Sequence, residues 1–339
     1  MPADRYREAG VDLDAGARAT AKIAKLVAST RTELSRGIVG GFGGMVRVPE
    51  DVRDPILVMS TDSVGTKVLV AADANRHDTI GEDLVNHCVN DILVHAARPI
   101  AFTDYIAVAS IDPDAVAAIV EGVARGCRAH DMTLAGGEVA EMPNLYQAGH
   151  YDLAGNILGV VSEGDALHGD RVRPGDVLVG YASTGLHTNG YSLARRIVFD
   201  QLGLDMASEI PELGTSAADA LLRVHRSYHA AVSSVLPRVH ALAHITGGGL
   251  PGNLSRSLPD GCGASIDTAT WQVPPLFTFL QERGNVGRNE MFDVFNMGIG
   301  FVAIVPSAAV DDVQTAAQGA DVPTWVIGEV VRGQGVRLE

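Results

Sequence analysis

The stretch that most constrains the fold is the apolar run Pro55–Met59 and the polar segment Ser60–Lys67 that follows it. The run is short and aliphatic, so it predicts a buried strand that leads into a loop of hydroxyl groups. In that loop Asp62 can bind Mg²⁺, Gly65 lets the backbone approach a ligand closely, and Lys67 can offset phosphate charge. A Ser/Thr-rich turn with a solvated lysine is an equally good interpretation of this stretch alone.

Length and charge limit the class of protein. With 339 residues the chain exceeds the size at which one core keeps growing, and the Pro174–Asp176 turn suggests a domain boundary near residue 170. We therefore expect domains at 1–170 and 171–339. The net charge of −15 and the aromatic content of 5% argue against a nucleic-acid partner, because an acidic surface repels phosphate and few rings can stack on bases.

The cysteines and the N-terminal segment bear on location. Cys88, Cys127 and Cys262 are far apart and form no C-x-x-C pair, which is typical of intracellular thiols. Met1–Tyr6 has no apolar leader, and no stretch has the length needed to cross a bilayer. The sequence predicts a cytoplasmic protein without a membrane partner.

Residues 78–97 show the periodicity of a helix with one apolar face. Asp83, His87 and Asn90–Asp91 fall on the opposite stripe, and a solvated face is the preferred interpretation of Asp83 and His87. Asp91 differs because it offers a second carboxylate to accompany Asp62. A third carboxylate, Glu138, follows Gly136–Gly137 at the predicted end of another strand, so the three could converge on one cation.

Three glycine-rich segments are candidate phosphate or substrate loops. Arg36–Gly44 contains Gly41–Gly44 around Phe42 and is either a plain hairpin connection or a lid over phosphates. The predicted strand 177–182 leads through Ser183–Gly190 into a helix, an arrangement that binds anions. His187 in that loop is a candidate acid or base, although a lone loop histidine is more often merely exposed.

The third segment, Thr246–Asn253, formally contains G-x-G-x-x-G. The match is poor, because Pro251 interrupts it and the following segment is too short for a long crossover helix. A simple phosphate-binding turn is the better interpretation, and a nicotinamide-dependent oxidoreductase is the weaker alternative.

Taken together, these segments resemble aminoimidazole ribonucleotide (AIR) synthetase, the phosphoribosylformylglycinamidine cyclo-ligase family. The matching segments are Tyr6–Asp12, Gly41–Gly44, Thr61–Lys67, Val89–Asp91, Gly136–Pro143, His187–Ser192, His244–Gly249 and Phe295–Gly300. Ser63 stands where the family usually has Gly, and Leu186 and Thr188 stand where Pro and Ser are frequent, which affects fine positioning more than activity.

The resemblance implies an α/β subunit of the α+β type. Its N-terminal domain (1–170) would bind ATP, and its small sheet would pair with that of a second copy in a homodimer barrel. Residues 171–339 would form a larger C-terminal α/β domain. The implied reaction converts formylglycinamidine ribonucleotide and ATP to 5-aminoimidazole ribonucleotide, ADP and phosphate through an iminophosphate. Mg²⁺ is implied as well, and a requirement for a monovalent cation is left open.

The resemblance also implies residue roles. Asp62, Asp91 and Glu138 would bind the metal, and His187, Lys67 and Asp62 would serve catalysis. The implied nucleotide contacts are Gly41, Phe42, Gly43, Gly44, Thr61, Asp62, Gly65, Thr66, Lys67, Asn90, Asp91, Gly136, Gly137 and Glu138. The implied substrate contacts are His187, Thr188, Asn189, Thr246, Gly247, Gly248 and Gly249. Two alternatives remain open at this point, namely another ATP-using enzyme of the superfamily and a non-catalytic nucleotide-binding dimer.

Overall fold

The computed structural model of the chain describes residue 5 and residues 7–38 and 40–339. Residues 1–4, Tyr6 and Val39 lie outside the described residues. The predictions that fall on them are the lack of an apolar leader at Met1–Tyr6, the start of the first matching segment at Tyr6, and one position of the Arg36–Gly44 loop. The chain divides into two compact units, one formed by residues 1–92 and 98–162 and the other by residues 93–97 and 163–339. Both units combine sheets and helices, so the predicted two-domain α/β fold is confirmed.

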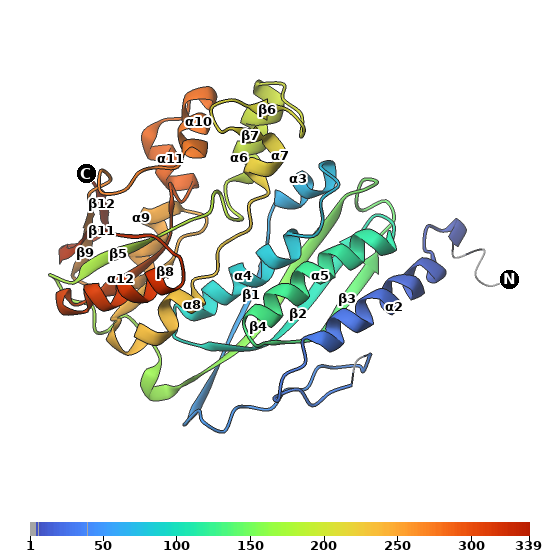
Figure 1. Cartoon of the computed structure of the whole chain (residues 1–339), viewed down its shortest axis with the longest axis horizontal. Helices are drawn as coiled ribbons and strands as arrows, with labels where there is room; N and C mark the ends of the chain where they lie inside the picture. Colours follow the sequence, from blue (N-terminus) through green and yellow to red (C-terminus); the bar gives the residue numbers. More distant parts are fainter. Residues whose placement is uncertain (1–4, 6, 39) are drawn as a thin grey trace. The chain divides into compact units, whose positions relative to one another are not determined.

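The first unit contains a four-stranded sheet in the order β1-β4-β2-β3 (Figure 1). Its elements, in chain order, are α2 (Leu13–Ser29), β1 (Pro55–Ser63), α3 (Lys67–Asp73), α4 (Ile80–Leu93), β2 (Arg98–Val108), α5 (Pro113–Ala129), β3 (Thr133–Glu141) and β4 (Tyr151–Ser162). β4 pairs antiparallel with β1 and β2, whereas β2 and β3 run parallel. The strand predicted from Pro55 continues through Asp62, because its ladder with β4 extends to Ser63. It is not buried as predicted, since β1 is an edge strand whose alternate residues, such as Leu57 and Met59, are exposed.

Helices α4 and α5 lie beside each other over this sheet (Figure 1), and glycines permit their close contact. A Cβ atom on Gly81 would lie 2.1 Å from the carbonyl oxygen of Ile119, and one on Gly122 would lie 2.8 Å from that of Asp78. α5 begins at a proline, after Asp112 has capped the amides of Asp114 and Ala115. The inner face is apolar, with Leu84 and Phe102 fully buried.

The second unit is built on a six-stranded sheet in the order β12-β9-β11-β5-β10-β8. The elements around it are β5 (Val177–Ala182), α6 (Tyr191–Arg195), a π-helical stretch (Arg196–Gln201), β6 (Glu209–Ile210), β7 (Thr215–Ser216), α7 (Ala217–Leu221), α8 (His229–Val232), β8 (Ala241–His244), α9 (Gly249–Leu254), β9 (Cys262–Ile266), α10 (Pro275–Gly284), α11 (Arg288–Val294), β10 (Ile299–Val305), α12 (Val310–Gly319), β11 (Thr324–Arg332) and β12 (Val336–Leu338). Tyr181, Tyr228 and Phe301 form the aromatic centre of its core.

This topology excludes the dinucleotide-binding alternative for Thr246–Asn253. β8 lies at one edge of the sheet, and β9 lies four strands away. The connection contains the six-residue helix α9 and a short 3-10 helix (Ser255–Ser257), and among the described residues every ladder of this sheet except β12–β9 is antiparallel. A dinucleotide site requires a parallel β-α-β unit around its glycine turn, so the simple-turn interpretation was the better one.

Candidate functional site

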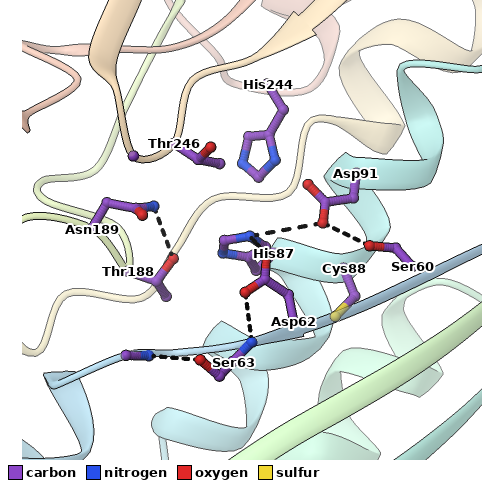
Figure 2. Close-up of polar contacts among 12 residues, drawn as sticks. Ser60, Asp62, Ser63, His87, Cys88, Asp91, Thr188, Asn189, His244 and Thr246 are labelled. Carbon is purple, nitrogen blue, oxygen red and sulfur yellow. Dashed lines mark hydrogen bonds and ion pairs between the residues drawn. The ribbon is translucent and has the colours of Figure 1, made fainter. Parts of the chain in front are cut away.

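The C-terminal end of β1 brings polar side chains of the first unit together. Asp62 Oδ2 lies 2.8 Å from Nε2 of His87, and Asp91 Oδ2 lies 3.8 Å from the same nitrogen. Ser60 donates a 2.9 Å hydrogen bond to Asp91, so Ser60, Asp91 and His87 form a connected group (Figure 2). One strand and one helix, β1 and α4, thus direct two carboxylates toward a single point.

Burial and charge act against each other in this group. Burial tends to raise the pKa of Asp62, but the hydrogen bond and charge of His87 lower it overall. Burial tends to lower the pKa of His87, but its hydrogen bond to Asp62 and the charges of Asp91 and Asp62 raise it overall. Both directions favour an ionised carboxylate beside a protonated imidazole.

This finding corrects the interpretation of the polar stripe on α4. Asp83 is fully buried and His87 is 3% exposed, so neither belongs to a solvated face. Asp83 forms an ion pair with Lys67, with 2.8 Å between Oδ2 and Nζ. Spacings of four residues place Asp83, His87 and Asp91 on one stripe of the helix, and this regularity was the signal for a functional face.

Lys67 is the first residue of α3, and its side chain is fully buried. Burial lowers its pKa, although the charge of Asp83 opposes this shift. Before it, Gly65 adopts φ +55° and donates its amide to the Ser63 hydroxyl, and Thr66 occupies the N-cap position. The structure thus pairs Lys67 with Asp83, and its predicted contact with phosphate stays a prediction.

The two ends of the Arg36–Gly44 segment are paired as in a hairpin. A bridge joins Ser35 to Val46 at its base, and a Cβ on Gly44 would lie 2.6 Å from Cβ of Ala135, so the base is held closely. At the tip, Phe42 is fully exposed. The hairpin interpretation agrees with this geometry, and the role as a lid stays a prediction.

The other predicted nucleotide contacts are spread over the sheet. Thr61 is exposed and accepts a hydrogen bond from Asn156, whereas Asn90 is fully buried on α4. Gly136 and Gly137 lie inside β3 rather than before its end. A Cβ on Gly137 would lie 1.8 Å from Oδ1 of Asp104, which explains the glycine there.

Glu138 lies apart from the other two carboxylates. It is an exposed residue within β3, and the ladders align it with Ser63 across β2 and β4. β1 and β3 are the outer strands, so three strand spacings, about 14 Å, separate them. Glu138 is aligned with Ser63, the residue next to Asp62. Because successive side chains of a strand point to opposite faces, Glu138 points to the face opposite to that of Asp62. Within one chain the predicted convergence of Asp62, Asp91 and Glu138 is therefore not found.

The pair that does converge suits a magnesium ion. Asp62 and Asp91 approach the same His87 nitrogen, so the two carboxylates lie close together, and a cation bound by both would take over the charge balance that the protonated imidazole provides. Carboxylate oxygens are the ligands that Mg²⁺ prefers, and Mg²⁺ is commonly held by one or two carboxylates together with phosphates and water. The residues present therefore fit the metal.

In the second unit, the Ser183–Gly190 loop connects β5 to α6 as predicted, but His187 is not exposed. Its side chain is 1% exposed, its φ is +62°, and the Thr184 amide donates to its Nε2 at 3.2 Å. Thr188 is buried next to it, and its hydroxyl oxygen accepts a 3.5 Å hydrogen bond from Nδ2 of the Asn189 side chain (Figure 2). The loop therefore presents a fixed imidazole rather than a freely moving one.

The Thr246–Gly249 turn is held by Asn253. Its Nδ2 donates to the carbonyl oxygens of Thr246, Gly247 and Gly249 at 3.2, 3.2 and 2.8 Å. Gly248 and Gly249 adopt φ +94° and +58°, conformations that favour glycine. These bonds hold the carbonyl groups on the Asn253 side and give the turn one conformation.

Sequence reasoning missed four side chains of these groups. Ser60 and His87 hold the carboxylates, and His225 and His244 contact the His187–Thr188 loop or each other. His244 lies in a matching segment but received no role. No pattern in the sequence marks His225, because it follows α7 in an irregular segment.

Among the residues that the structure describes, no helix is both long and apolar enough to cross a membrane.

Comparison with known proteins shows the family to which the chain is related. Residues 44–161 match the N-terminal domain model of AIR synthase related proteins, and residues 173–339 match the C-terminal domain model. A phosphoribosylformylglycinamidine cyclo-ligase from Trichlorobacter lovleyi is 47% identical over 97% of this chain and 95% of its own. One from Sorangium cellulosum is 46% identical over 98% of this chain and 97% of its own.

Solved structures share the fold at low identity. A thiamine-monophosphate kinase from Stenotrophomonas maltophilia has a TM-score of 0.67 at 20% identity, covering 94% of this chain and 95% of its own. HypE from E. coli has a TM-score of 0.65 at 19% identity, covering 93% and 92%. These matches extend over both units and confirm the fold class. The full-length relatives confirm the predicted resemblance and the cyclo-ligase class of enzyme: the chain belongs to the AIR synthase family.

Proposed function

We propose that the chain closes the imidazole ring of formylglycinamidine ribonucleotide with ATP, giving 5-aminoimidazole ribonucleotide, ADP and phosphate. The observation that carries this proposal is the 47% identity with a cyclo-ligase over 97% of the chain. A HypE structure in complex with ATP, with a TM-score of 0.63, supports the nucleotide. A cytoplasmic location belongs to the same proposal, because ATP and ribonucleotides are abundant there.

The chemistry requires an oxygen to leave from an amide. Transfer of the γ-phosphoryl group of ATP to that oxygen gives an iminophosphate and ADP. The amidine nitrogen then attacks the iminophosphate carbon, phosphate departs with the oxygen, and the nitrogen loses a proton. The protein therefore has to position two reactants and neutralise phosphate charge.

In the first domain (1–170), Asp62 and Asp91 hold Mg²⁺. When bound, the metal neutralises phosphate charge. Ser60 orients Asp91, and Asp62 is oriented by the Ser63 amide at 2.6 Å. Lys67 contributes its charge from the start of α3, and the remaining nucleotide contacts, with Gly41–Gly44 as the lid, keep the roles stated above.

In the second domain (171–339), His187 to Asn189 and Thr246 to Gly249 hold the ribonucleotide. The Thr184 amide donates to Nε2 of His187, so a neutral ring carries its proton on Nδ1. His187 is the candidate for proton handling in this segment.

The active form is a homodimer that pairs the open faces of the N-terminal sheets. Leu57 and Met59 on β1 are 53% and 64% exposed on that face, and covering them would remove apolar surface from water. Glu138 is also exposed on this open face, opposite to the face of Asp62, so its part in binding the metal stays a prediction. Met59→Glu should yield a monomer in sedimentation velocity, whereas a dimer of unchanged affinity would contradict this arrangement.

The test is to incubate purified protein with formylglycinamidine ribonucleotide, Mg²⁺ and ATP, and to follow ADP and the aminoimidazole product together. Equal formation of both is expected. ATP bound without imidazole formed would refute the proposal. That result would favour another ATP-using enzyme of the superfamily, or a non-catalytic nucleotide-binding dimer if no ADP appeared with any substrate.

A further inference from the structure

Three buried imidazoles lie together in the second unit. His187, His225 and His244 are 1%, 0% and 7% exposed. The rings of His187 and His225 stack at 4.1 Å between centroids with an 18° angle, and Nε2 of His225 lies 3.2 Å from Nε2 of His244. His225 belongs to neither of the two proposed substrate segments, yet it contacts both sides of this group.

Both ring nitrogens of His225 are engaged. Nδ1 lies 3.2 Å from Oγ1 of Thr188, in the first substrate segment, and Nε2 reaches His244, two residues before the second segment begins at Thr246. The backbone around His225 is held as well, because the Thr184 hydroxyl donates to the carbonyl oxygen of Val224. His225 thus links the two segments through one side chain.

The two hydrogen bonds that connect Thr188, His225 and His244 depend on each other in direction. A neutral imidazole donates from one nitrogen and accepts at the other. If Thr188 donates to Nδ1 of His225, then Nε2 of His225 donates to His244; if His244 donates to His225, then His225 donates to Thr188. The hydroxyl of Thr188 and the ring of His244 are therefore coupled, and changing one hydrogen bond reverses the other.

We propose that His225 is a positioning residue of the substrate site, which aligns Thr188 and His244 through its two ring nitrogens and supports the ring of His187 by stacking. This inference rests on the proposed function, since it takes the ribonucleotide as the ligand of both segments. His225 is fully buried, so it acts through these neighbours and has no direct contact with the ligand. Its loss should therefore weaken binding or turnover of the ribonucleotide and leave ATP binding unchanged.

Three substitutions separate hydrogen bonding from packing. His225→Phe keeps a ring for stacking but removes both hydrogen bonds. His225→Asn places an amide near the position of Nδ1 and can keep the bond to Thr188, and His225→Gln reaches toward the position of Nε2 and can keep the bond to His244. His168→Phe, at an exposed histidine of the same unit, is the matched control.

Binding of formylglycinamidine ribonucleotide is measured by calorimetry, and KM for each substrate and kcat are measured by ADP release. We expect His225→Phe to weaken ribonucleotide binding or to lower kcat at least tenfold, with KM for ATP within twofold of wild type. The Asn and Gln variants should lose less, and the control should lose nothing. Wild-type kinetics in His225→Phe, or an equal loss in all three His225 variants, would overturn the inference.

A second measurement addresses the bonds directly. In long-range ¹H–¹⁵N spectra of histidine-labelled protein, we expect one of the two facing Nε2 atoms to be protonated and the other not, and His225→Asn should change the His244 signals. Unchanged His244 signals would overturn the inference. If wild-type protein binds the ribonucleotide but forms no imidazole, the proposed function fails, and binding by the variants still decides the role of His225.

Discussion

Nζ of Lys67 lies 2.8 Å from Oδ2 of Asp83, and neither side chain is exposed. Removing one partner of such a pair leaves a buried charge without its counter-ion, which costs about 3 to 5 kcal/mol. We therefore expect Asp83→Ala to lower the unfolding free energy by about that amount, as measured by urea unfolding.

The exposed pair of Arg98 and Asp51 supplies the control, since Asp51→Ala should cost less than about 1 kcal/mol. The double variant Lys67→Met/Asp83→Leu should recover much of the loss, because it removes both charges. A loss in Asp83→Ala no larger than in Asp51→Ala would contradict the buried pair.

Asp104 should make stability depend on pH. Burial raises the pKa of its carboxyl from 3.8 to about 7, and its Oδ2 has no hydrogen-bond partner among the described residues. Between about pH 4 and pH 7 the native state keeps a proton that the unfolded chain has lost, so the free energy of unfolding falls as pH rises, by roughly 1.4 kcal/mol per pH unit.

The variant Asp104→Asn is uncharged at every pH and removes this dependence. Relative to wild type it should gain thermal stability at pH 8 and gain least near pH 4, as measured by the melting temperature. Asp131→Asn, at an exposed carboxylate of the same unit, should show no such difference. An equal shift at both pH values would contradict the prediction.

Gly300 on β10 is required by the ring of His187. A Cβ at this position would lie 2.1 Å from Oη of Tyr228 and 2.5 Å from Cε1 of His187. Gly300→Ala should therefore destabilise the second unit by about 1 to 3 kcal/mol and, by displacing His187, lower kcat. Gly319→Ala, at the end of α12 with open space around it, should leave kcat unchanged and be neutral or slightly stabilising. The comparison fails if the two variants behave alike.

Asp62 and Asp91 should set the requirement for magnesium. Asp62→Asn or Asp91→Asn removes one of two negative ligands, so the Mg²⁺ concentration for half-maximal ADP release should rise at least about tenfold. Ser60→Ala should raise it less, because Asp91 loses only one hydrogen bond. Asp114→Asn, at an exposed carboxylate, is the control. Unchanged magnesium titrations in both aspartate variants would refute the proposed metal ligands.

Local patterns were sufficient for much of the fold. The apolar run at Pro55 predicted β1, and the periodicity of residues 78–97 predicted α4. Each depends on residues that are close in sequence, where side-chain spacing and caps act directly. The ordered motifs also identified the family, because family-specific residues such as those around Asp62 and His187 are readable without coordinates.

Tertiary structure decided how these residues meet. The sequence alone could not show that Asp83 and His87 are buried, because a polar stripe has the same pattern whether it faces water or other polar groups. Likewise, the position of Glu138 after two glycines led to the prediction that it lies near Asp62. In the folded chain the strand order and register place the two residues on opposite edges and opposite faces of one sheet. The sequence by itself determined the elements and the family, since local spacing and residue type encode both. Strand order, burial and the partners of His87, Lys67 and His225 were decided only by the folded chain, because they depend on contacts between residues far apart in sequence.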